Sequence, residues 1–202
     1  MNTKKKKSLI YPVLFMTALT LFTTLILAIL NQSTLDIVKA NQELELRKKI
    51  LYVFNSYDEN MTNDEVNKLF EEKITEEDYK EDMPIYTFKS DEGSLKAIPF
   101  EGPGLWGLIT GYIGVDESLN NVKGVEFISQ NETPGLGGRI SENPYKEQYR
   151  NIDISGRDNN FIMNNPSPDG NIDAIAGATQ TSNFVTQMIN KALSEYKGGG
   201  NK

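Results

Sequence analysis

The chain of 202 residues contains no cysteine and no histidine. The usual protein ligands of iron–sulfur clusters, haem and structural zinc are therefore missing, and we predict no metal site. Nucleophilic sites that depend on an imidazole base, such as Ser-His and Cys-His pairs, are excluded for the same reason. If the chain takes part in redox chemistry, an organic cofactor must supply that chemistry.

Basic residues are also fewer than acidic ones. The formal net charge is -7, and the first thirty residues hold four lysines and no acidic residue, so the rest of the chain is more acidic than the whole. This charge argues against nucleic acid as a partner. With 38% hydrophobic residues, a chain of this length suits one membrane anchor and one globular domain.

One long uncharged segment, residues 9–30, is present near the N-terminus. About 20 apolar residues are enough for a helix to cross a bilayer, so we predict a transmembrane helix. Because Lys4–Lys7 precede it, we expect residues 1–8 to be a cytoplasmic basic tail and the domain to lie outside the inner (cytoplasmic) membrane. A cleaved signal peptide is the alternative, although the segment is long for one and no small-x-small cleavage site follows.

Small side chains recur along one face of the predicted span, at Thr17, Thr20, Thr24 and Ala28. Transmembrane helices pack closely along such faces, which indicates docking against other membrane subunits. The threonine hydroxyls could instead bond to the backbone carbonyls of their own helix.

Helical spacing continues after the span. Leu35, Val38, Leu46, Ile50 and Val53 predict a stalk helix over residues 31–54. We assign residues 55–202 to the globular domain. Within its acidic first part, apolar residues at helical spacing predict one short surface helix: Val66, Leu69, Phe70 and Ile74.

The pattern then changes from helical to strand-like. We predict strands at residues 85–88, 105–109, 111–115 and 122–128, with a hairpin connection at 116–121 and a further short strand at 161–163. Apolar residues at helical spacing, Val185, Met188, Ile189 and Ala192, predict a closing helix over about 183–196 that covers the sheet. The predicted class is α+β, with a mainly antiparallel sheet packed by helices.

The most informative motif is Asp173-Ala174-Ile175-Ala176-Gly177-Ala178-Thr179. It presents a hydroxyl, that of Thr179, immediately before the closing helix, where helix-terminal N–H groups can hold a phosphate. The alternative is a plain turn, with Thr181, Ser182 or Asn183 capping the helix.

Two glycine-rich loops accompany this motif, at residues 101–106 and 132–138. Their glycines allow a close approach of the backbone to a flat or phosphorylated group. Ordinary structural turns explain the same residues.

Three segments in this order, Gly104-Leu105-Trp106, Glu132-Thr133-Pro134-Gly135-Leu136-Gly137 and Asp173 to Ser182, resemble the FMN-binding subunits of membrane redox complexes. The greatest similarity is to the C subunit of the sodium-translocating NADH:quinone oxidoreductase, together with the membrane start Tyr11–Met16 and the stretch Ile50–Phe54. The G subunit of the Rnf complex shares the second and third motifs but usually lacks Gly-Leu-Trp.

This resemblance implies that Thr179 carries FMN through a phosphoester, installed by a separate flavin transferase that uses FAD as donor. Asp173, Gly177 and Ala178 match the motif that the transferase reads, whereas family members usually have serine or threonine at the position of Ala176. The other cofactor-binding residues implied by the resemblance are Thr181, Ser182, Glu132, Thr133, Gly135, Leu136, Gly137, Leu105 and Trp106. Trp106 as an ordinary core aromatic is the alternative for that residue.

The resemblance further implies an electron-carrier subunit that has no catalytic residues of its own and relays electrons between partner subunits. Those partners would handle NADH and quinone and transport sodium. Two alternatives stay open at this point. One is the corresponding subunit of an Rnf-type ferredoxin:NAD oxidoreductase, and the other is a membrane-anchored binding or sensory domain without redox function.

Overall fold

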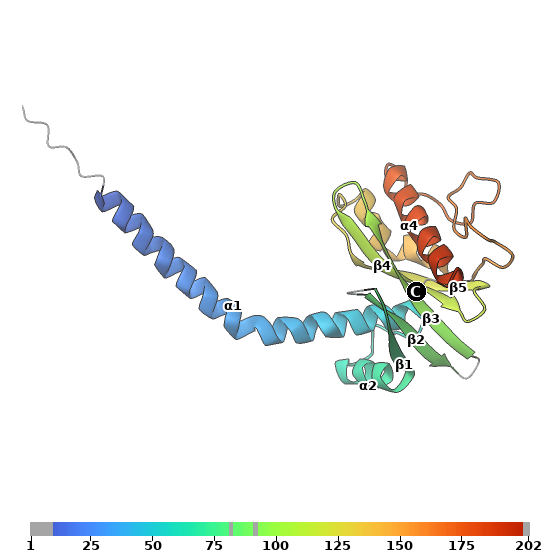
Figure 1. Ribbon diagram of the computed structural model, residues 1–202, viewed down its shortest axis with the longest axis horizontal. Helices are drawn as coiled ribbons and strands as arrows, with labels where there is room; N and C mark the ends of the chain where they lie inside the picture. The colour runs from blue at the N-terminus through green and yellow to red at the C-terminus, as the bar shows by residue number, and fades with distance from the viewer. Residues whose placement is uncertain (1–9, 81–82, 91–92, 200–202) are drawn as a thin grey trace, which may run out of the picture. The chain divides into compact units, whose positions relative to one another are not determined.

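The computed structural model describes residues 10–80, 83–90 and 93–199 (Figure 1). The predicted basic tail at 1–8, with Lys4–Lys7, and residue Leu9 lie outside the described residues. The chain divides into two compact units, Met1–Glu43 and Leu44–Lys202. Each unit is described by itself below.

Helix α1 (Ile10–Val53) covers residues 10–30 of the predicted span and residues 31–53 of the predicted stalk. In its first part the apolar side chains are exposed, for example Leu21 at 67% and Phe22 at 62%. By length and composition this helix can cross a membrane. Its last residues, from Leu44 onward, belong to the second unit.

The second unit is built on one antiparallel sheet of six strands, in the order β1-β2-β3-β4-β5-β6. The strands are β1 (Ile74–Lys80), β2 (Met83–Ser90), β3 (Gly93–Pro103), β4 (Leu108–Asp116), β5 (Asn121–Ser129) and β6 (Ile152–Asp153). Each strand pairs with its neighbour in sequence, so the sheet is a meander. The predicted α+β class is confirmed.

Several strand predictions need correction. Residues 105–107 form a turn, closed by a bond from the Gly104 N–H to the Gly107 carbonyl (2.8 Å), and not the start of a strand. Residues 161–163 make no strand, although Phe161 and Ile162 are buried and Met163 is partly buried. Their apolar side chains fill the core from a loop, a pattern that a short buried strand also shows. The predicted hairpin connection between β4 and β5 is present.

The helices cover the sheet. Helix α2 (Asn63–Lys73) contains Val66, Leu69 and Phe70 of the predicted surface helix, whereas Ile74 begins β1. The short segments η1 (Gly137–Ser141), α3 (Asn143–Lys146) and η2 (Glu147–Tyr149) follow β5. Helix α4 (Thr179–Lys197) packs against β3 and buries the four predicted apolar residues. It begins four residues earlier than predicted. Thr181 and Ser182 are fully buried in its first turns, so the prediction that they or Asn183 cap the helix is wrong.

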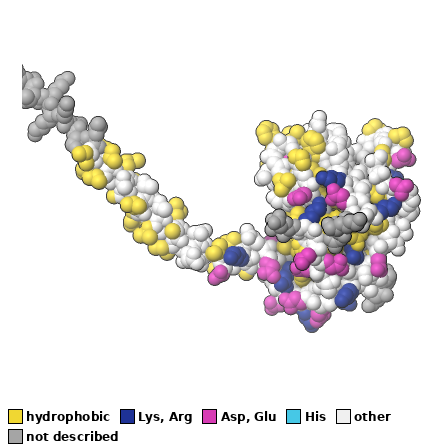
Figure 2. Space-filling model, viewed as in Figure 1, with side chains coloured by type: hydrophobic (Ala, Val, Ile, Leu, Met, Phe, Trp, Pro, Cys, Tyr) yellow, Lys and Arg dark blue, Asp and Glu magenta, His cyan; other side chains and the backbone are white. Residues whose placement is uncertain are grey.

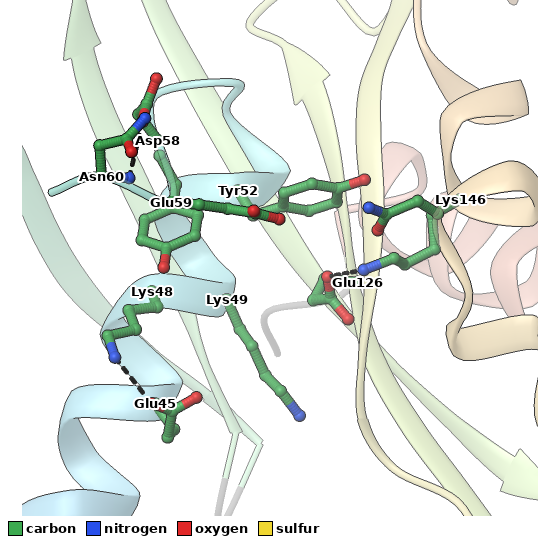
Figure 3. A pocket seen from close by; sticks show the side chains of 11 residues that line it. Glu45, Lys48, Lys49, Tyr52, Asp58, Glu59, Asn60, Glu126 and Lys146 are labelled. Atoms are coloured by element: carbon green, nitrogen blue, oxygen red, sulfur yellow. Dashed lines mark hydrogen bonds and ion pairs between the residues drawn. The ribbon is translucent and has the colours of Figure 1, made fainter.

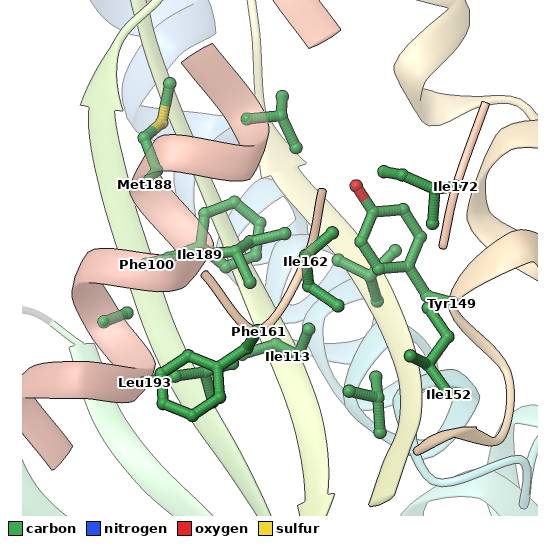
Figure 4. Close-up of a cluster of buried hydrophobic side chains, with 14 of the residues drawn as sticks. Phe100, Ile113, Tyr149, Ile152, Phe161, Ile162, Ile172, Met188, Ile189 and Leu193 are labelled. Carbon is green, nitrogen blue, oxygen red and sulfur yellow. The ribbon is translucent and has the colours of Figure 1, made fainter. Parts of the chain in front are cut away.

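Two hydrophobic clusters line the two faces of the sheet. One includes Phe100, Ile113, Phe161, Ile189 and Leu193, and joins the sheet to α4 and the loop before it (Figure 4). The other joins the sheet to α2 and the end of α1, through residues such as Ile50, Val66, Tyr86 and Tyr112. Tyr112 and Ile113 are consecutive in β4 and enter different clusters, because successive side chains of a strand point to opposite faces.

The C-terminal end of α1 is joined to the sheet by Arg150. Its guanidinium donates hydrogen bonds to the carbonyls of Tyr52 (2.8 Å) and Val53 (3.1 Å), and to that of Lys123 (2.7 Å). The last carbonyls of a helix have no partner within the helix, so Arg150 supplies the missing donors. Gly124 leaves the space for this contact, since an added Cβ there would lie 2.2 Å from the Arg150 Nη1 atom.

Candidate flavin site

Thr179 is the first residue of α4, and its side chain is exposed. The N-cap residue is Ala178, which offers no side-chain oxygen to the helix. In the described part of the chain, the backbone N–H groups of Thr179, Gln180 and Thr181 have no acceptor. The start of α4 therefore combines an accessible hydroxyl with free donors and the positive end of the helix dipole, an arrangement that suits a phosphate.

The turn that carries Thr179 is held by Ser182. The Ser182 hydroxyl accepts a hydrogen bond from the Ile175 N–H (3.0 Å) and donates one to the Ala178 carbonyl (3.2 Å). Gly177 has a φ of +79°, a conformation that residues with a Cβ rarely adopt. Thus Gly177 permits the turn, and the buried hydroxyl of Ser182 faces the turn from inside.

Asp173 begins the motif and is held by residues that the sequence did not indicate. Its N–H donates to the Gln148 side-chain oxygen (2.6 Å), and its carboxylate accepts from the Asn165 amide (2.6 Å). A groove of about 220 Å³ runs beside the motif, from Arg139 and Gln148 to Ala176. No sequence pattern could have found Gln148 or Asn165, because they are single polar residues that approach Asp173 only after folding.

Hydrogen bonds to the Glu132 side chain link the glycine-rich loop at 132–138 to the loop at 101–106 and to α4. Its side chain is buried, with a relative exposure of 5%. One oxygen, Oε1, accepts from the N–H groups of Leu105 (2.8 Å) and Trp106 (3.1 Å), and the other, Oε2, accepts from the Thr181 hydroxyl (2.6 Å). The structure therefore brings together residues from all three motifs around this carboxylate.

The glycine-rich loop after Glu132 also approaches the turn that precedes Thr179. A Cβ added at Gly177 would lie 3.3 Å from the Leu136 side chain. Thr133 is exposed, and its carbonyl accepts from the N–H groups of Leu136 (3.1 Å) and Gly138 (3.0 Å), which closes the loop around the exposed Gly135. Leu136 thus places the loop beside the residues that precede Thr179.

Apolar side chains are exposed around these segments. Among the described residues after α1, the large hydrophobic side chains that are exposed are Leu105, Trp106, Leu108 and Leu136. Trp106 is 71% exposed, so its interpretation as a core aromatic is wrong. Figure 2 shows hydrophobic side chains reaching the surface of this unit among charged ones. An exposed apolar group of this kind marks a place for a flat ligand or a partner.

These residues fit FMN in two respects. The start of α4 offers a hydroxyl and free N–H donors to a phosphate, whereas Leu105, Trp106 and Leu136 offer apolar contacts to a ring system. The predicted flavin residues are therefore grouped, with Asp173 at one end of the turn and Glu132 and Thr181 buried beneath. In the described part of the chain no group of acidic residues could hold a metal ion.

A larger cavity, of about 500 Å³, lies elsewhere, between the end of α1, residues 57–60 and α3 (Figure 3). Its three lysines already have partners. Lys48 pairs with Glu45 (2.8 Å), Lys49 donates to the carbonyls of Phe127 and Ile128, and Lys146 pairs with Glu126 (2.6 Å). We therefore assign no ligand to this cavity.

Comparison with known proteins identifies the type of domain. Residues 104–194 match the family model of the FMN-binding domain. The C subunit of the Na(+)-translocating NADH-quinone reductase of Pasteurella multocida is 34% identical over 123 residues, which are 57% of this chain and 47% of that protein. The same subunit of Yersinia pestis is 31% identical over 121 residues, 56% of this chain and 46% of that protein. The chain therefore contains a segment that matches the FMN-binding domain and is similar in sequence to NqrC proteins.

Solved structures of NqrC proteins share the fold. The NqrC protein from Parabacteroides distasonis superposes with a TM-score of 0.67 at 27% identity, covering 82% of this chain and 96% of that one. NqrC from Shewanella oneidensis gives a TM-score of 0.62 at 19% identity, covering 78% and 92%. The chain spans about half the length of the curated NqrC relatives that it matches. The family match includes the turn at Leu105–Trp106, Glu132 and Thr179.

Proposed function

We propose that this chain is an electron-carrier subunit of a sodium-translocating NADH:quinone oxidoreductase, with FMN covalently attached to Thr179. The observation that carries this proposal is the selective exposure of one hydroxyl. Of the three hydroxyl residues at the start of α4, Thr181 and Ser182 are fully buried and Thr179 is exposed. Only Thr179 can therefore be reached by a modifying enzyme without opening the domain.

The attachment is a phosphoryl transfer and involves no oxidation or reduction. The Thr179 oxygen forms a bond to the phosphorus of the FMN half of FAD, the bond from that phosphorus to the AMP half breaks, and AMP leaves. The hydroxyl proton passes to a base of the flavin transferase. The phosphodiester keeps one negative charge, which the free N–H groups at the start of α4 stabilise.

A covalent link suits a site of this shape. The exposed apolar residues Leu105, Trp106 and Leu136 offer a surface and not an enclosed pocket. A surface gives weak binding, and a tether keeps a weakly bound group at high local concentration. FMN, when bound, supplies one- and two-electron redox chemistry, and its exposure would let electrons pass to and from neighbouring subunits.

The remaining parts of the proposal rest on the family and on α1. Residues 9–30 would form a single membrane span, residues 31–54 a stalk, and residues 55–202 an extracytoplasmic flavin domain, with the N-terminus in the cytoplasm. NADH oxidation, quinone reduction and sodium transport would belong to partner subunits. The relatives named above are subunits of such a complex, and the turn at Gly104-Leu105-Trp106 favours this assignment over the Rnf-type subunit.

The test is to co-express the full chain with a flavin transferase and to look for flavin fluorescence after denaturing electrophoresis. We expect the wild type to be fluorescent and Thr179→Ala to be colourless. Thr133→Ala, which removes an exposed threonine from the neighbouring loop, should keep the flavin. Mass spectrometry of the tryptic peptide should place the added mass on Thr179. A wild-type chain without flavin, or a labelled Thr179→Ala variant, would refute the proposal.

A further inference from the structure

Glu132 has a carboxylate that is fully engaged by the protein. It is buried, and its oxygens together accept three hydrogen bonds, from the N–H groups of Leu105 and Trp106 and from the Thr181 hydroxyl. A buried carboxylate with several donors is strongly held, whereas the loss of it would leave buried donors without acceptors. The side chain therefore faces protein donors from two other segments.

Two glycines make room for this carboxylate. A Cβ added at Gly104 would lie 2.5 Å from the Glu132 Oε1 atom. A Cβ added at Gly137 would lie 2.6 Å from Oε2 and 2.7 Å from the Thr181 hydroxyl. These distances are too short for a real side chain, so the close approach of Glu132 explains why glycine occupies positions 104 and 137.

The exposed apolar turn depends on these bonds. Leu105 and Trp106 are 52% and 71% exposed, so their side chains make few contacts that could fix them. Within the described residues, the turn is held by the Gly104–Gly107 backbone bond and by the two N–H bonds to Glu132. Through Thr181, the same carboxylate ties the turn to the helix that carries Thr179.

We propose that Glu132 is a positioning residue for the flavin, which acts by fixing the Leu105–Trp106 turn relative to α4. This inference rests on the proposed function, because it concerns the ring of an FMN attached at Thr179. The backbone and side chains of the turn, and not the Glu132 carboxylate itself, then border the ring.

The chain offers a direct probe of this role, because Trp106 is its single tryptophan. Time-resolved fluorescence anisotropy of the full chain in detergent, before flavin loading, reports the local motion of Trp106 alone. We expect Glu132→Ala to add a fast nanosecond loss of anisotropy that the wild type lacks, as an unrestrained loop does. Glu132→Gln should restore the slow decay, because its amide oxygen can accept both N–H bonds and its amide nitrogen can donate to Thr181.

A second readout uses the loaded protein. The isoalloxazine ring is achiral, so its visible circular dichroism arises from fixed asymmetric surroundings. We expect Glu132→Ala to carry flavin at Thr179 but to lose this dichroism, and Glu132→Gln to keep it. Glu101→Ala removes an exposed carboxylate from the same hairpin and is the matched control, which should behave as the wild type in both measurements.

The outcomes separate the two proposals. Unchanged anisotropy and unchanged dichroism in Glu132→Ala would overturn the positioning role, even with flavin attached. A wild type without flavin would overturn the proposed function and leave the Trp106 measurement on the unloaded chain intact. If Glu132→Ala does not fold by far-ultraviolet circular dichroism, Glu132→Asp replaces it. The shorter carboxylate of that variant cannot reach both loops, so it must show the same fast motion or the inference is wrong.

Discussion

The buried ion pair of Lys146 and Glu126 joins several elements of the second unit. Their side chains are 9% and 8% exposed and their charged atoms are 2.6 Å apart. The Lys146 ammonium also lies 4.2 Å from the centre of the Tyr52 ring, on the last turn of α1. Through these contacts, one lysine connects α3, β5 and the end of α1.

We predict that Lys146→Met lowers the free energy of unfolding by about 3–5 kcal/mol, because it leaves the Glu126 carboxylate buried without its partner. The double variant Lys146→Met with Glu126→Leu should recover most of this loss, since no charge is left buried. Urea denaturation measures both. Lys191→Met is the control, because its pair with Glu195 is exposed and spans 3.8 Å, and such pairs contribute about 0–1 kcal/mol. Equal losses in the two single variants would contradict this account.

The sequence predicted which segments lie close together, but not the hydrogen bonds that join them. The order of the three motifs predicted the grouping around Thr179, and the exposure of that residue agrees with its expected role. The bonds of Glu132 and the support of Asp173 by Gln148 and Asn165 could not be predicted. They join residues 8–49 positions apart, whose approach depends on the complete sheet and on the loop before α4.

Helix α2 is stabilised by a capping box at its N-terminus. The Thr62 hydroxyl accepts from the Glu65 N–H (3.3 Å), and the Glu65 carboxylate accepts from the Thr62 N–H (2.8 Å). These bonds satisfy donors that have no partner inside the helix. The helix in turn buries Val66 and Phe70 against the second face of the sheet.

We therefore predict that Thr62→Ala lowers the free energy of unfolding by about 1 kcal/mol. Thr62→Ser, which keeps the hydroxyl, should retain nearly all of the wild-type stability. The measurement is the midpoint of urea unfolding at constant slope. Equal midpoints for Thr62→Ala and the wild type would show that the capping box contributes nothing.

Elements with a regular apolar pattern were predictable, and elements without one were not. Helices α1, α2 and α4 follow apolar residues at helical spacing. Strand β1 is an edge strand whose residues Thr75–Asp78 are polar and exposed, so its sequence has no strand pattern. Strand β3 contains Pro99, which argues against a strand in the interior of a sheet. The first turn of α4 was missed because threonine and serine usually cap helices, whereas here they are buried inside one.

The buried tyrosines make the stability of the second unit depend on pH in the alkaline range. Tyr145 and Tyr149 lie in the core with their hydroxyls 3.0 Å apart. Burial raises the pKa of Tyr145 to about 12 and that of Tyr149 well above its ordinary value. On the other face, burial also raises the pKa of Tyr86 to about 12 and the pKa of Tyr112. A raised pKa in the folded state means that folding favours the protonated phenol.

The direction of the pH dependence follows. Below about pH 10, tyrosine is protonated in both the folded and the unfolded chain, so the buried tyrosines contribute fully to the free energy of unfolding. Between about pH 10 and 12 the unfolded chain loses its protons first, so the free energy of unfolding falls by roughly 1.4 kcal/mol per pH unit for each such tyrosine. Urea denaturation between pH 8 and 12 measures this slope. The Tyr145→Phe variant should show a shallower fall, and a flat profile in the wild type would contradict the prediction.

The meander has a consequence for biosynthesis. Every strand pairs with a neighbour in sequence, so each hairpin can close soon after the ribosome has released it. Thr179 comes after all six strands, so the ribosome releases its hydroxyl only after the whole sheet has been synthesised. Under the proposed function, a polypeptide terminated before Thr179 lacks the attachment residue, so only chains translated beyond that position can carry FMN.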